Sequence, residues 1–273
     1  MSDKYAVFGN PIAHSLSPLI HAFFAKTLNE DIEYGRVLVE EGGFVKAADE
    51  FKATGGKGFN VTAPCKIDAF NYVDKLSDAA KIAGAVNTVK FTADGVLGDN
   101  TDGVGFISDL KRLKAKLEGA NVLLIGAGGA AQGILYPLVK SEAAKITVVN
   151  RTESKALSLA KKFNSDKVDA KGFDSLTGDF SVIINASSSS LFKELPPIND
   201  AFIKKAAFVY DLAYTKEGST VFTQKAQSLG VSAAFDGLGM LIMQAAASYE
   251  IWRGVRPDVE AAISYMRSVL SSR

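Results

Sequence analysis

The sequence has one cysteine, two histidines and almost no excess of charge of either sign. A single cysteine cannot form an internal disulfide or a cysteine-rich zinc site, which suits a reducing compartment. The histidines, His14 and His21, have no third ligand at a suitable spacing, so we expect no metal. The 31 Lys and Arg residues against 30 Asp and Glu residues give a formal net charge of +1. We therefore expect neither nucleic acid nor an acidic membrane as a partner.

An export signal and an uninterrupted hydrophobic run of membrane-spanning length are also missing. The first residues lead directly into a short apolar segment at residues 5–8, so no signal peptide is visible and we expect a cytoplasmic protein. Residues 122–139 carry no charge, but several glycines and Pro137 interrupt them. That pattern is typical of a buried strand, a tight turn and a helix rather than of a membrane span.

The 273 residues, of which 47% are hydrophobic, are enough for two domains of ordinary size. In the first hundred residues, short apolar segments alternate with amphipathic ones, which predicts βαβ units and a largely parallel sheet. We expect strands at residues 5–8, 33–39 and 57–62, helices at residues 18–28 and 43–53, and a β-hairpin of residues 86–91 and 96–97 around Ala93-Asp94-Gly95.

The second half of the chain alternates in the same way before it becomes purely helical. After a helix at residues 104–113 and a polar joint, we expect strands at residues 122–125, 146–149, 182–185 and 208–210, with helices at residues 129–139 and 154–163. Residues 238–252 and 257–270 indicate two further helices. Since no strand follows them, the pattern favours a return of the chain to the first domain.

A small-residue motif, Gly126-x-Gly128-x-x-Ala131, follows the strand at residues 122–125 and opens the next helix. In dinucleotide-binding βαβ units, the first glycine permits the tight turn and the second lets the backbone approach the pyrophosphate. The third small residue lets helix and strand pack closely, and the helix N-terminus attracts the phosphate charge. A glycine triplet alone also fits a simple turn, but the strand before it and the helix after it predict a dinucleotide site.

The next strand ends in Asn150-Arg151-Thr152, and Lys155 follows. A site for NAD usually offers an acid at this point, about twenty residues after the glycines, to the ribose hydroxyl. An acid would repel a 2′-phosphate, whereas a guanidinium, an ammonium and neutral donors bind one by charge-assisted hydrogen bonds. The same residues also fit a solvated basic helix start, but together with the glycines they favour NADP.

We therefore predict an α/β protein with two domains. The first, residues 1–103 plus 238–273, is an N-terminal, mainly parallel α/β substrate domain to which the C-terminal helices return. The second, residues 104–237, is a Rossmann-type NADP-binding domain. NADP in turn indicates an enzyme that transfers hydride.

Polar residues gather where the apolar segments of the first domain end, at residues 14–17, 60–66 and 98–103. In open α/β sheets, ligands bind beyond the carboxyl ends of the strands, so these clusters are candidates for a substrate site. Lys66 lies in the second cluster, and a lysine after a strand is by itself an ordinary surface residue. Its pairing with an acid of another cluster does not follow from spacing.

These clusters resemble the motifs of the shikimate dehydrogenase family. The similar segments are Gly9-Asn10-Pro11-Ile12-Ala13-His14-Ser15-Leu16-Ser17-Pro18, Asn60-Val61-Thr62 with Pro64 and Lys66, Gly84-Ala85-Val86-Asn87-Thr88, Gly98-Asp99-Asn100-Thr101-Asp102-Gly103, Gly126-Ala127-Gly128-Gly129-Ala130, Asn150-Arg151-Thr152 and Asp236-Gly237-Leu238-Gly239-Met240-Leu241. They occur in the family's order along essentially the whole chain. The resemblance implies reversible NADPH-dependent reduction of 3-dehydroshikimate to shikimate, on the pathway to chorismate and aromatic amino acids.

The resemblance also implies the roles of individual residues, with Lys66 as the catalytic acid/base and Asp102 as its partner. The implied substrate contacts are Ser15 and Ser17 for the carboxylate, Thr62, Lys66, Asn87, Asp102 and Gln244 for the hydroxyls and the reacting oxygen, and Tyr214 from the cofactor side. The implied cofactor contacts are Gly126, Ala127, Gly128, Gly129, Ala130, Asn150, Arg151, Thr152, Lys155, Ser187, Leu212, Gly237 and Met240. Asp78 is a further cofactor candidate that equally fits an exposed acid at a helix start.

Several positions depart from the family pattern. Ala63 and Cys65 replace larger apolar residues beside Lys66, and Cys65 fits either a small buried hydrophobe or a thiol sensitised by the ammonium. Ser190 replaces a glycine, which restricts φ where the loop approaches the cofactor. Leu212-Ala213 is smaller than the usual pair, which predicts a looser nicotinamide pocket.

Other functions stay open at this point. A quinate/shikimate dehydrogenase that uses NAD or either cofactor would share most of these motifs. A non-catalytic NADP-binding regulator would keep the fold without turnover, although Lys66 and Asp102 speak against it. An enzyme similar to methylenetetrahydrofolate dehydrogenase is a third alternative that Asn100-Thr101-Asp102-Gly103 does not suit. The sequence is compatible with a monomer or a homodimer.

Overall fold

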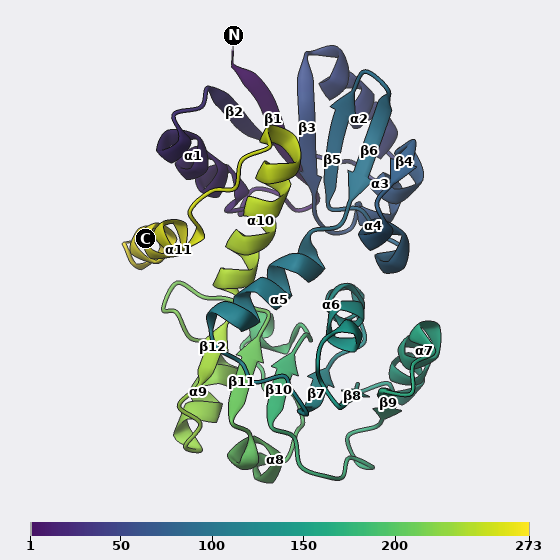
Figure 1. The fold of residues 1–273 in the computed structure, drawn as a ribbon, viewed down its shortest axis with the longest axis vertical. Coiled ribbons are helices and arrows are strands. Elements are labelled where there is room, and N and C mark those ends of the chain that lie inside the picture. Colours follow the sequence, from purple (N-terminus) through teal and green to yellow (C-terminus); the bar gives the residue numbers. More distant parts are fainter. Residues whose placement is uncertain (1, 273) are drawn as a thin grey trace. The chain divides into compact units, whose positions relative to one another are not determined.

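The computed structural model describes residues 2–272 and divides the chain into two compact units. Unit 1 runs to Gly105 and also contains Ile242–Met266. Unit 2 contains Phe106–Leu241 and the residues that follow Met266. Each unit has its own six-stranded sheet (Figure 1).

The sheet of unit 1 has the strand order β2-β1-β3-β5-β6-β4. Its strands are β1 (Asp3–Gly9), β2 (Ile32–Leu38), β3 (Gly56–Val61), β4 (Lys75–Leu76), β5 (Thr88–Thr92) and β6 (Gly95–Asp99), and its helices are α1 (Ser17–Leu28), α2 (Phe44–Ala53), α3 (Lys66–Tyr72) and α4 (Asp78–Ala83). β1 pairs in parallel with β2 and β3, whereas β5 is antiparallel to both β3 and β6. The predicted βαβ units and the hairpin are confirmed, and the hairpin makes the sheet mixed.

The late helices α10 (Leu238–Arg253) and α11 (Val259–Ser271) bring the chain back to unit 1. The Trp252 indole stacks on Tyr5 of β1 at 4.6 Å between ring centroids and donates to the Val89 carbonyl at 2.9 Å. An indole buries a large apolar area and satisfies its one polar group at the same time. The predicted return of the C-terminal helices is therefore confirmed (Figure 1).

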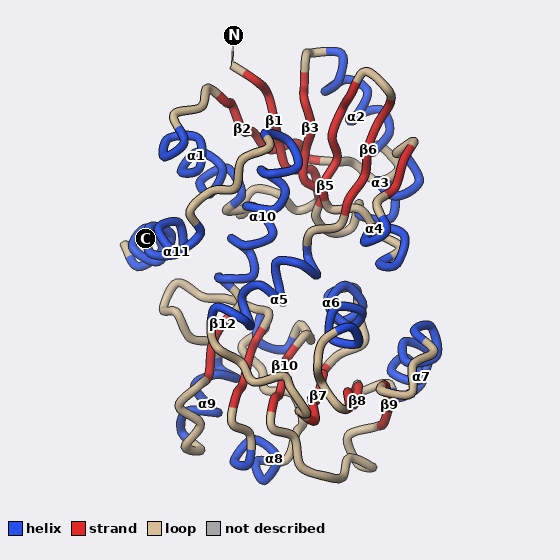
Figure 2. The backbone as a smooth tube through the Cα atoms, in the orientation of Figure 1, coloured by secondary structure: helices blue, strands red, loops and turns tan. Residues whose placement is uncertain are grey.

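The sheet of unit 2 is entirely parallel, in the order β12-β11-β10-β7-β8-β9 (Figure 1). Figure 2 shows its strands in red and the helices that accompany them in blue. Its strands are β7 (Asn121–Ile125), β8 (Lys145–Val149), β9 (Val168–Lys171), β10 (Val182–Asn185), β11 (Phe208–Asp211) and β12 (Ala234–Asp236). Its helices are α5 (Asp102–Arg112), which begins in unit 1, α6 (Gly129–Lys140), α7 (Glu153–Phe163), the 3₁₀ helix η1 (Ser189–Phe192), α8 (Asp200–Lys205) and α9 (Val221–Ser228). This is the doubly wound order of a Rossmann sheet, so the predicted fold class is confirmed.

The central strands β7 and β10 are buried along almost their whole length. Strands covered on both faces must be apolar throughout, which explains the uncharged run from Val122 into α6. Within residues 2–272, no helix has the length and apolar character needed to cross a membrane. The strand order reverses between β7 and β10, and such a switch point is where ligands bind in open α/β sheets.

The compact units do not follow the predicted functional domains residue for residue. The chain enters unit 2 within α5, after Gly105, and leaves it within α10, after Leu241. The residues from Arg267 on group with unit 2, where Arg267 pairs with Asp236. The division into residues 1–103 plus 238–273 and residues 104–237 remains a prediction about function.

Candidate active site

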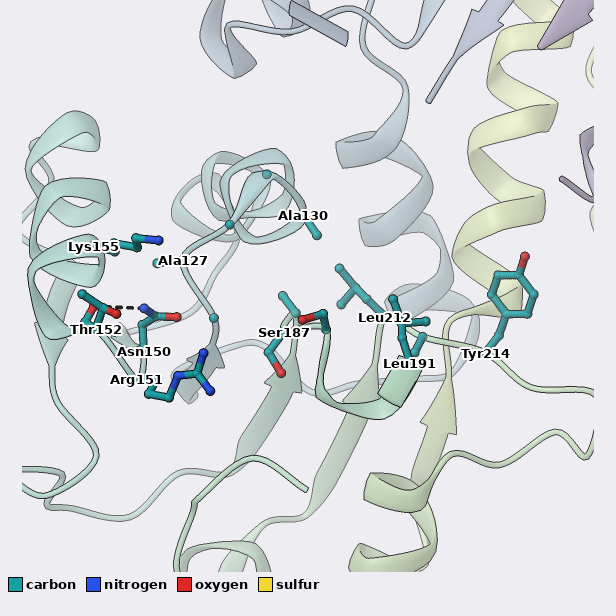
Figure 3. Close-up of a pocket in the computed structure, with 16 residues that line it drawn as sticks. Ala127, Ala130, Asn150, Arg151, Thr152, Lys155, Ser187, Leu191, Leu212 and Tyr214 are labelled. Atoms are coloured by element: carbon teal, nitrogen blue, oxygen red, sulfur yellow. Dashed lines mark hydrogen bonds between the residues drawn. The ribbon is translucent and has the colours of Figure 1, made fainter. Parts of the chain in front are cut away.

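A cavity of about 740 Å³ lies at the switch point of unit 2. Its lining comes from the loops after β7, β8, β10 and β11 (Figure 3). The lining residues are Gly126, Ala127, Gly128, Gly129, Ala130, Asn150, Arg151, Thr152, Lys155, Ala186, Ser187, Ser188, Leu191, Leu212, Ala213 and Tyr214. Most of the predicted cofactor residues of this unit therefore lie around one cavity, and Tyr214, predicted as a substrate contact, also lines it.

The backbone around the glycines fits a pyrophosphate. Gly126 has φ +109°, a conformation that favours glycine, and a Cβ there would lie 2.9 Å from the Ala186 backbone. A Cβ on Gly128 or Gly129 would meet no atom within 4 Å, so open space lies over this stretch of backbone. Gly128 is the N-cap of α6, and the free N–H groups of a helix start bind phosphate.

One end of the cavity is basic. Asn150, Arg151, Thr152 and Lys155 lie together there in Figure 3, and the Asn150 amide donates to the Thr152 carbonyl at 2.9 Å. Within residues 2–272, neither Arg151 nor Lys155 has an ion-pair partner, so both cations are free to bind an anion. The neighbouring acid, Glu153, instead accepts a hydrogen bond from the Gly172 N–H at 3.0 Å. This end fits a 2′-phosphate.

The opposite end of the cavity carries Leu191, Leu212 and Tyr214, with Ser187 between the two ends (Figure 3). The side-chain carbonyl oxygen of Asn185, at the end of β10, accepts hydrogen bonds from the Ser187 N–H at 3.1 Å and from the Ser187 hydroxyl at 2.7 Å. Asn185 is completely buried, so it fixes the loop that separates the basic end from the apolar end.

Ser190 does not restrict this loop in the way the sequence suggested. It has no left-handed φ in the structure, where the left-handed residue of the turn is Lys193. The Ser190 hydroxyl donates to Asp211 at 2.5 Å, and Thr220 donates to the same carboxylate at 2.6 Å. Burial raises the pKa of Asp211, and these donors oppose that rise. The serine therefore anchors the loop to the end of β11.

The catalytic candidates of unit 1 meet in one place. Lys66 is the first residue of α3, directly after the loop that follows β3, and Asp102 is the first residue of α5, after β6. The Lys66 Nζ lies 2.5 Å from the Asp102 Oδ2, and both side chains keep partial solvent contact. An ammonium against a carboxylate beside the strand ends can move a proton to or from a ligand.

Asn87 holds the carboxylate of this pair. Its amide donates to the Asp102 Oδ1 at 2.8 Å, and its side-chain carbonyl oxygen accepts the Thr101 N–H at 2.9 Å. Gln244 of α10 is near enough to accept from the same amide at 3.4 Å. Three of the predicted substrate residues, Asn87, Asp102 and Gln244, are thus brought together with Lys66.

The structure adds residues that the sequence analysis did not single out. The Ser248 hydroxyl of α10 lies within hydrogen-bond distance of Thr88, at 2.7 Å, and of Thr101, at 3.1 Å. It also accepts from the Asn60 amide at 3.0 Å. Ser248 is completely buried and fastens α10 to the loops that carry Asn87 and Asp102. A serine spaced four residues after Gln244 on a predicted helix is the only local signal for it.

The serines predicted to hold the carboxylate lie at the start of α1. The Ser15 hydroxyl lies 3.3 Å from both the Ser17 hydroxyl and the Ser17 N–H, and Ser17 is buried at the first position of the helix. Thr62 follows the last residue of β3, and its N–H donates to the Phe8 carbonyl at 2.9 Å. These residues share the strand ends of unit 1 with Lys66.

Other predicted residues lie elsewhere. Asp78 begins α4, is 93% exposed and pairs with Lys81, so the exposed helix-start interpretation describes its surroundings. Gly237 packs directly against the Leu212 backbone, and Met240 is half-buried against the core of unit 2.

Cys65 is 3% exposed, and burial raises the pKa of its thiol. This favours the interpretation of Cys65 as a small buried hydrophobe over that of a sensitised thiol.

Comparisons with known proteins agree on a single protein family. Three family models match the chain: the shikimate dehydrogenase substrate binding domain over residues 7–89, shikimate/quinate 5-dehydrogenase over residues 109–213, and the shikimate 5′-dehydrogenase C-terminal domain over residues 237–264. A protein named shikimate dehydrogenase (NADP(+)), from Vibrio atlanticus (strain LGP32), is 46% identical over 270 residues, which cover 98% of each chain.

Solved structures agree with these sequence matches. An Ael1 enzyme from Pseudomonas putida has a TM-score of 0.91 and 39% identity over 97% of this chain and 98% of its own. A shikimate 5-dehydrogenase from Thermus thermophilus, solved in complex with NADP(H) and shikimate, has a TM-score of 0.87 and 30% identity. That match covers 97% of this chain and 99% of the other.

Proposed function

The chain belongs to the shikimate dehydrogenase family of NADP-dependent oxidoreductases, and on that premise we propose that Lys66 and Asp102 are the acid/base pair of its reaction. The reaction is the reversible NADPH-dependent reduction of 3-dehydroshikimate to shikimate, a step of the shikimate pathway. The observation that carries the assignment of the pair is the distance of 2.5 Å between the Lys66 ammonium and the Asp102 carboxylate.

The substrate binds at the strand ends of unit 1 in this proposal. Ser15 and Ser17 hold its carboxylate, while Thr62, Asn87, Asp102 and Gln244 bind its hydroxyls. Tyr214 contacts the substrate from the side of the cofactor. Neutral amide and hydroxyl groups suit a polyol, because a site built to hydrogen-bond hydroxyls rejects analogues that lack them.

Lys66 acts on the oxygen at the reacting carbon. That oxygen gains negative charge when the ketone is reduced, and an ammonium at hydrogen-bond distance both stabilises this charge and donates a proton to it. Asp102, which Asn87 orients at 2.8 Å, keeps the lysine side chain in place through their contact. In the direction of shikimate oxidation, the same pair removes the hydroxyl proton.

The cofactor lies in the cavity of unit 2 in this proposal. When bound, NADPH supplies the hydride. The backbone from Gly126 to Ala130 holds the pyrophosphate. The 2′-phosphate is held by Asn150, Arg151, Thr152 and Lys155. Ser187 and Leu212 border the nicotinamide. Gly237 and Met240 also belong to the nicotinamide site, where Gly237 packs against the Leu212 backbone.

The function is tested by following NADP⁺ reduction with purified protein and shikimate, beside quinate and beside NAD⁺. We expect strong activity only with shikimate and NADP⁺. Comparable rates with quinate or NAD⁺ would assign the chain to the quinate/shikimate branch of the family. If no combination of substrate and cofactor gives activity but the protein still binds NADP⁺, the non-catalytic regulator is favoured.

The pair is tested by Lys66→Ala. Removing the ammonium takes away proton transfer and charge stabilisation, so kcat should fall by about 10²- to 10⁴-fold. The dissociation constant of NADP⁺, measured by fluorescence titration, should change little because Lys66 is not among the residues that line the cavity. The control is Lys81→Ala, which removes an exposed lysine that pairs with Asp78. Turnover near that of the wild type would exclude Lys66 from the mechanism.

We further propose that the enzyme works in the cytoplasm, as a monomer or a homodimer. The single cysteine is buried and free, which fits a reducing compartment.

A further inference from the structure

Arg36 places a positive charge beside the serines that are proposed to hold the carboxylate. Arg36 lies on β2, near the end of the strand, and its Nη2 donates to the Ser15 carbonyl at 2.7 Å. The Ser15 hydroxyl in turn lies 3.3 Å from the Ser17 hydroxyl. The Arg36 guanidinium therefore contacts the backbone of the segment that carries the Ser15 and Ser17 hydroxyl groups.

Tyr34 lies two residues before Arg36 on the same strand. Side chains two residues apart on a strand point to the same face of the sheet. Burial raises the pKa of Tyr34, while the Ser17 side chain and the Arg36 guanidinium act in the opposite direction. The Tyr34 hydroxyl donates to the side-chain carbonyl oxygen of Asn60 at 2.7 Å, which leads on to the buried network around Asn87.

The charge of Arg36 is not balanced by an acid. In the part of the chain that the structure describes, no carboxylate lies within ion-pair distance of its guanidinium. Its Nη2 donates to a neutral carbonyl oxygen, and a guanidinium has five N–H donors. The remaining donors and the whole positive charge are available to an anion at the serine pair.

We propose that Arg36 is a specificity-determining residue that selects substrates with a carboxylate at the Ser15–Ser17 end of the site. This inference rests on the proposed function. Serine hydroxyls alone bind a carboxylate, an ester or a hydroxyl group without a preference for charge, whereas a guanidinium favours the carboxylate. Arg36 thus distinguishes a monocarboxylate polyol from a neutral polyol of the same shape, and it also holds the Ser15 segment in place.

If the charge of Arg36 selects the carboxylate, its removal should change the KM of shikimate more than that of shikimate methyl ester. For Arg36→Gln, the KM for shikimate should rise about five- to twentyfold, because an ion–ion contact is replaced by a neutral one. The kcat should stay within about twofold, since the same interaction is made in the ground state and in the transition state. The KM, or the inhibition constant, of shikimate methyl ester should change less than about twofold, because the ester has no charge to lose.

Ionic strength supplies a second measurement on the same proteins. Salt screens exposed charges, with a screening length of about 10 Å at 0.1 M. Raising the salt concentration should increase the wild-type KM for shikimate and leave the KM of Arg36→Gln nearly constant. Arg36→Lys keeps the charge without the planar fork and should show an intermediate KM and the wild-type response to salt.

The outcomes separate this inference from the proposed function. If wild-type protein does not oxidise shikimate with NADP⁺, the proposed function fails first. If wild type is active but Arg36→Gln weakens shikimate and its methyl ester equally, Arg36 only holds the Ser15 segment and the inference is wrong. An unchanged KM for shikimate also overturns it. If Arg36→Gln does not fold, Arg36→Lys decides the question, because loss of the salt response in that charged variant would contradict the role of the charge.

Discussion

At the residue scale, our proposal assigns the preference for NADP over NAD to the side chains that follow β8. Arg151 and Lys155 are both exposed and have no ion-pair partner among residues 2–272, while Glu153 is engaged with the Gly172 backbone. An acid in the place of Arg151 would favour the free ribose hydroxyl of NAD. In the proposed site, the choice of cofactor thus depends on Arg151 and Lys155 and on Glu153, whose carboxylate binds the Gly172 backbone instead.

The substitution Arg151→Gln tests this account of the 2′-phosphate. Loss of a charge-assisted hydrogen bond costs about 1.5–3 kcal/mol, which corresponds to a rise of about 10- to 150-fold in the KM for NADP⁺. The KM for NAD⁺, which has no 2′-phosphate, should change less than about threefold. Lys161→Gln, a change to another exposed lysine on α7, is the matched control. An equal loss for both cofactors would mean that Arg151 does not recognise the phosphate.

At the element scale, an ion pair between Arg267 and the buried Asp236 joins α11 to β12. The Asp236 side chain is completely buried, and both of its oxygens accept hydrogen bonds from the Arg267 guanidinium. The Thr215 N–H, beside Tyr214, also reaches the same carboxylate at 3.4 Å. A charge buried without a partner is strongly destabilising, so Arg267 sets the position of the last turns of α11 against unit 2.

Arg267→Met should therefore destabilise the protein by about 2–4 kcal/mol, which is less than a fully buried pair costs because Arg267 itself keeps some solvent contact. The measurement is the midpoint of urea unfolding at an unchanged slope. Adding Asp236→Asn to the variant removes the unpaired charge and should recover part of the loss. As a control, Lys205→Met breaks a pair with Asp179 that is exposed on both sides, and should change stability by less than about 1 kcal/mol. Equal effects of Arg267→Met and Lys205→Met would contradict the role of burial.

The elements that sequence could predict are those whose signal is local. The turn at Gly126 and the basic strand end at Arg151 are visible in a few consecutive residues. β9 was not predicted, because an edge strand that is only half-buried throughout has no continuous apolar run. The Ser248 network was not predicted either, since Ser248 and Asn60 are 188 residues apart and a hydrogen bond over that separation leaves no pattern in the sequence.

At the scale of the whole molecule, the sequence predicted two sheets and the return of the late helices, but not how the interior of unit 1 is filled. Tyr34, Tyr249 and Trp252 come from β2 and α10 and surround His21 of α1. The His21 ring lies 4.2 Å from the Tyr34 ring at 5° between their planes. Neither of its ring nitrogens has a hydrogen-bond partner among residues 2–272. A titratable group thus lies in an aromatic core, which makes the stability of the molecule depend on pH.

Burial lowers the pKa of His21 to about 3 in the folded protein, against about 6.5 in an unfolded chain. Between these two values the unfolded state binds one proton more than the folded state, so stability falls as the pH falls below about 6.5. Between pH 7 and pH 5 this single group should cost about 2 kcal/mol.

The substitution His21→Phe keeps an aromatic ring in the stack and removes the titration. The test compares the free energy of unfolding of wild type and His21→Phe at both pH values. The His21→Phe variant should lose about 2 kcal/mol less than wild type on acidification. Parallel curves for the two proteins would show that His21 takes up its proton equally well in the folded core.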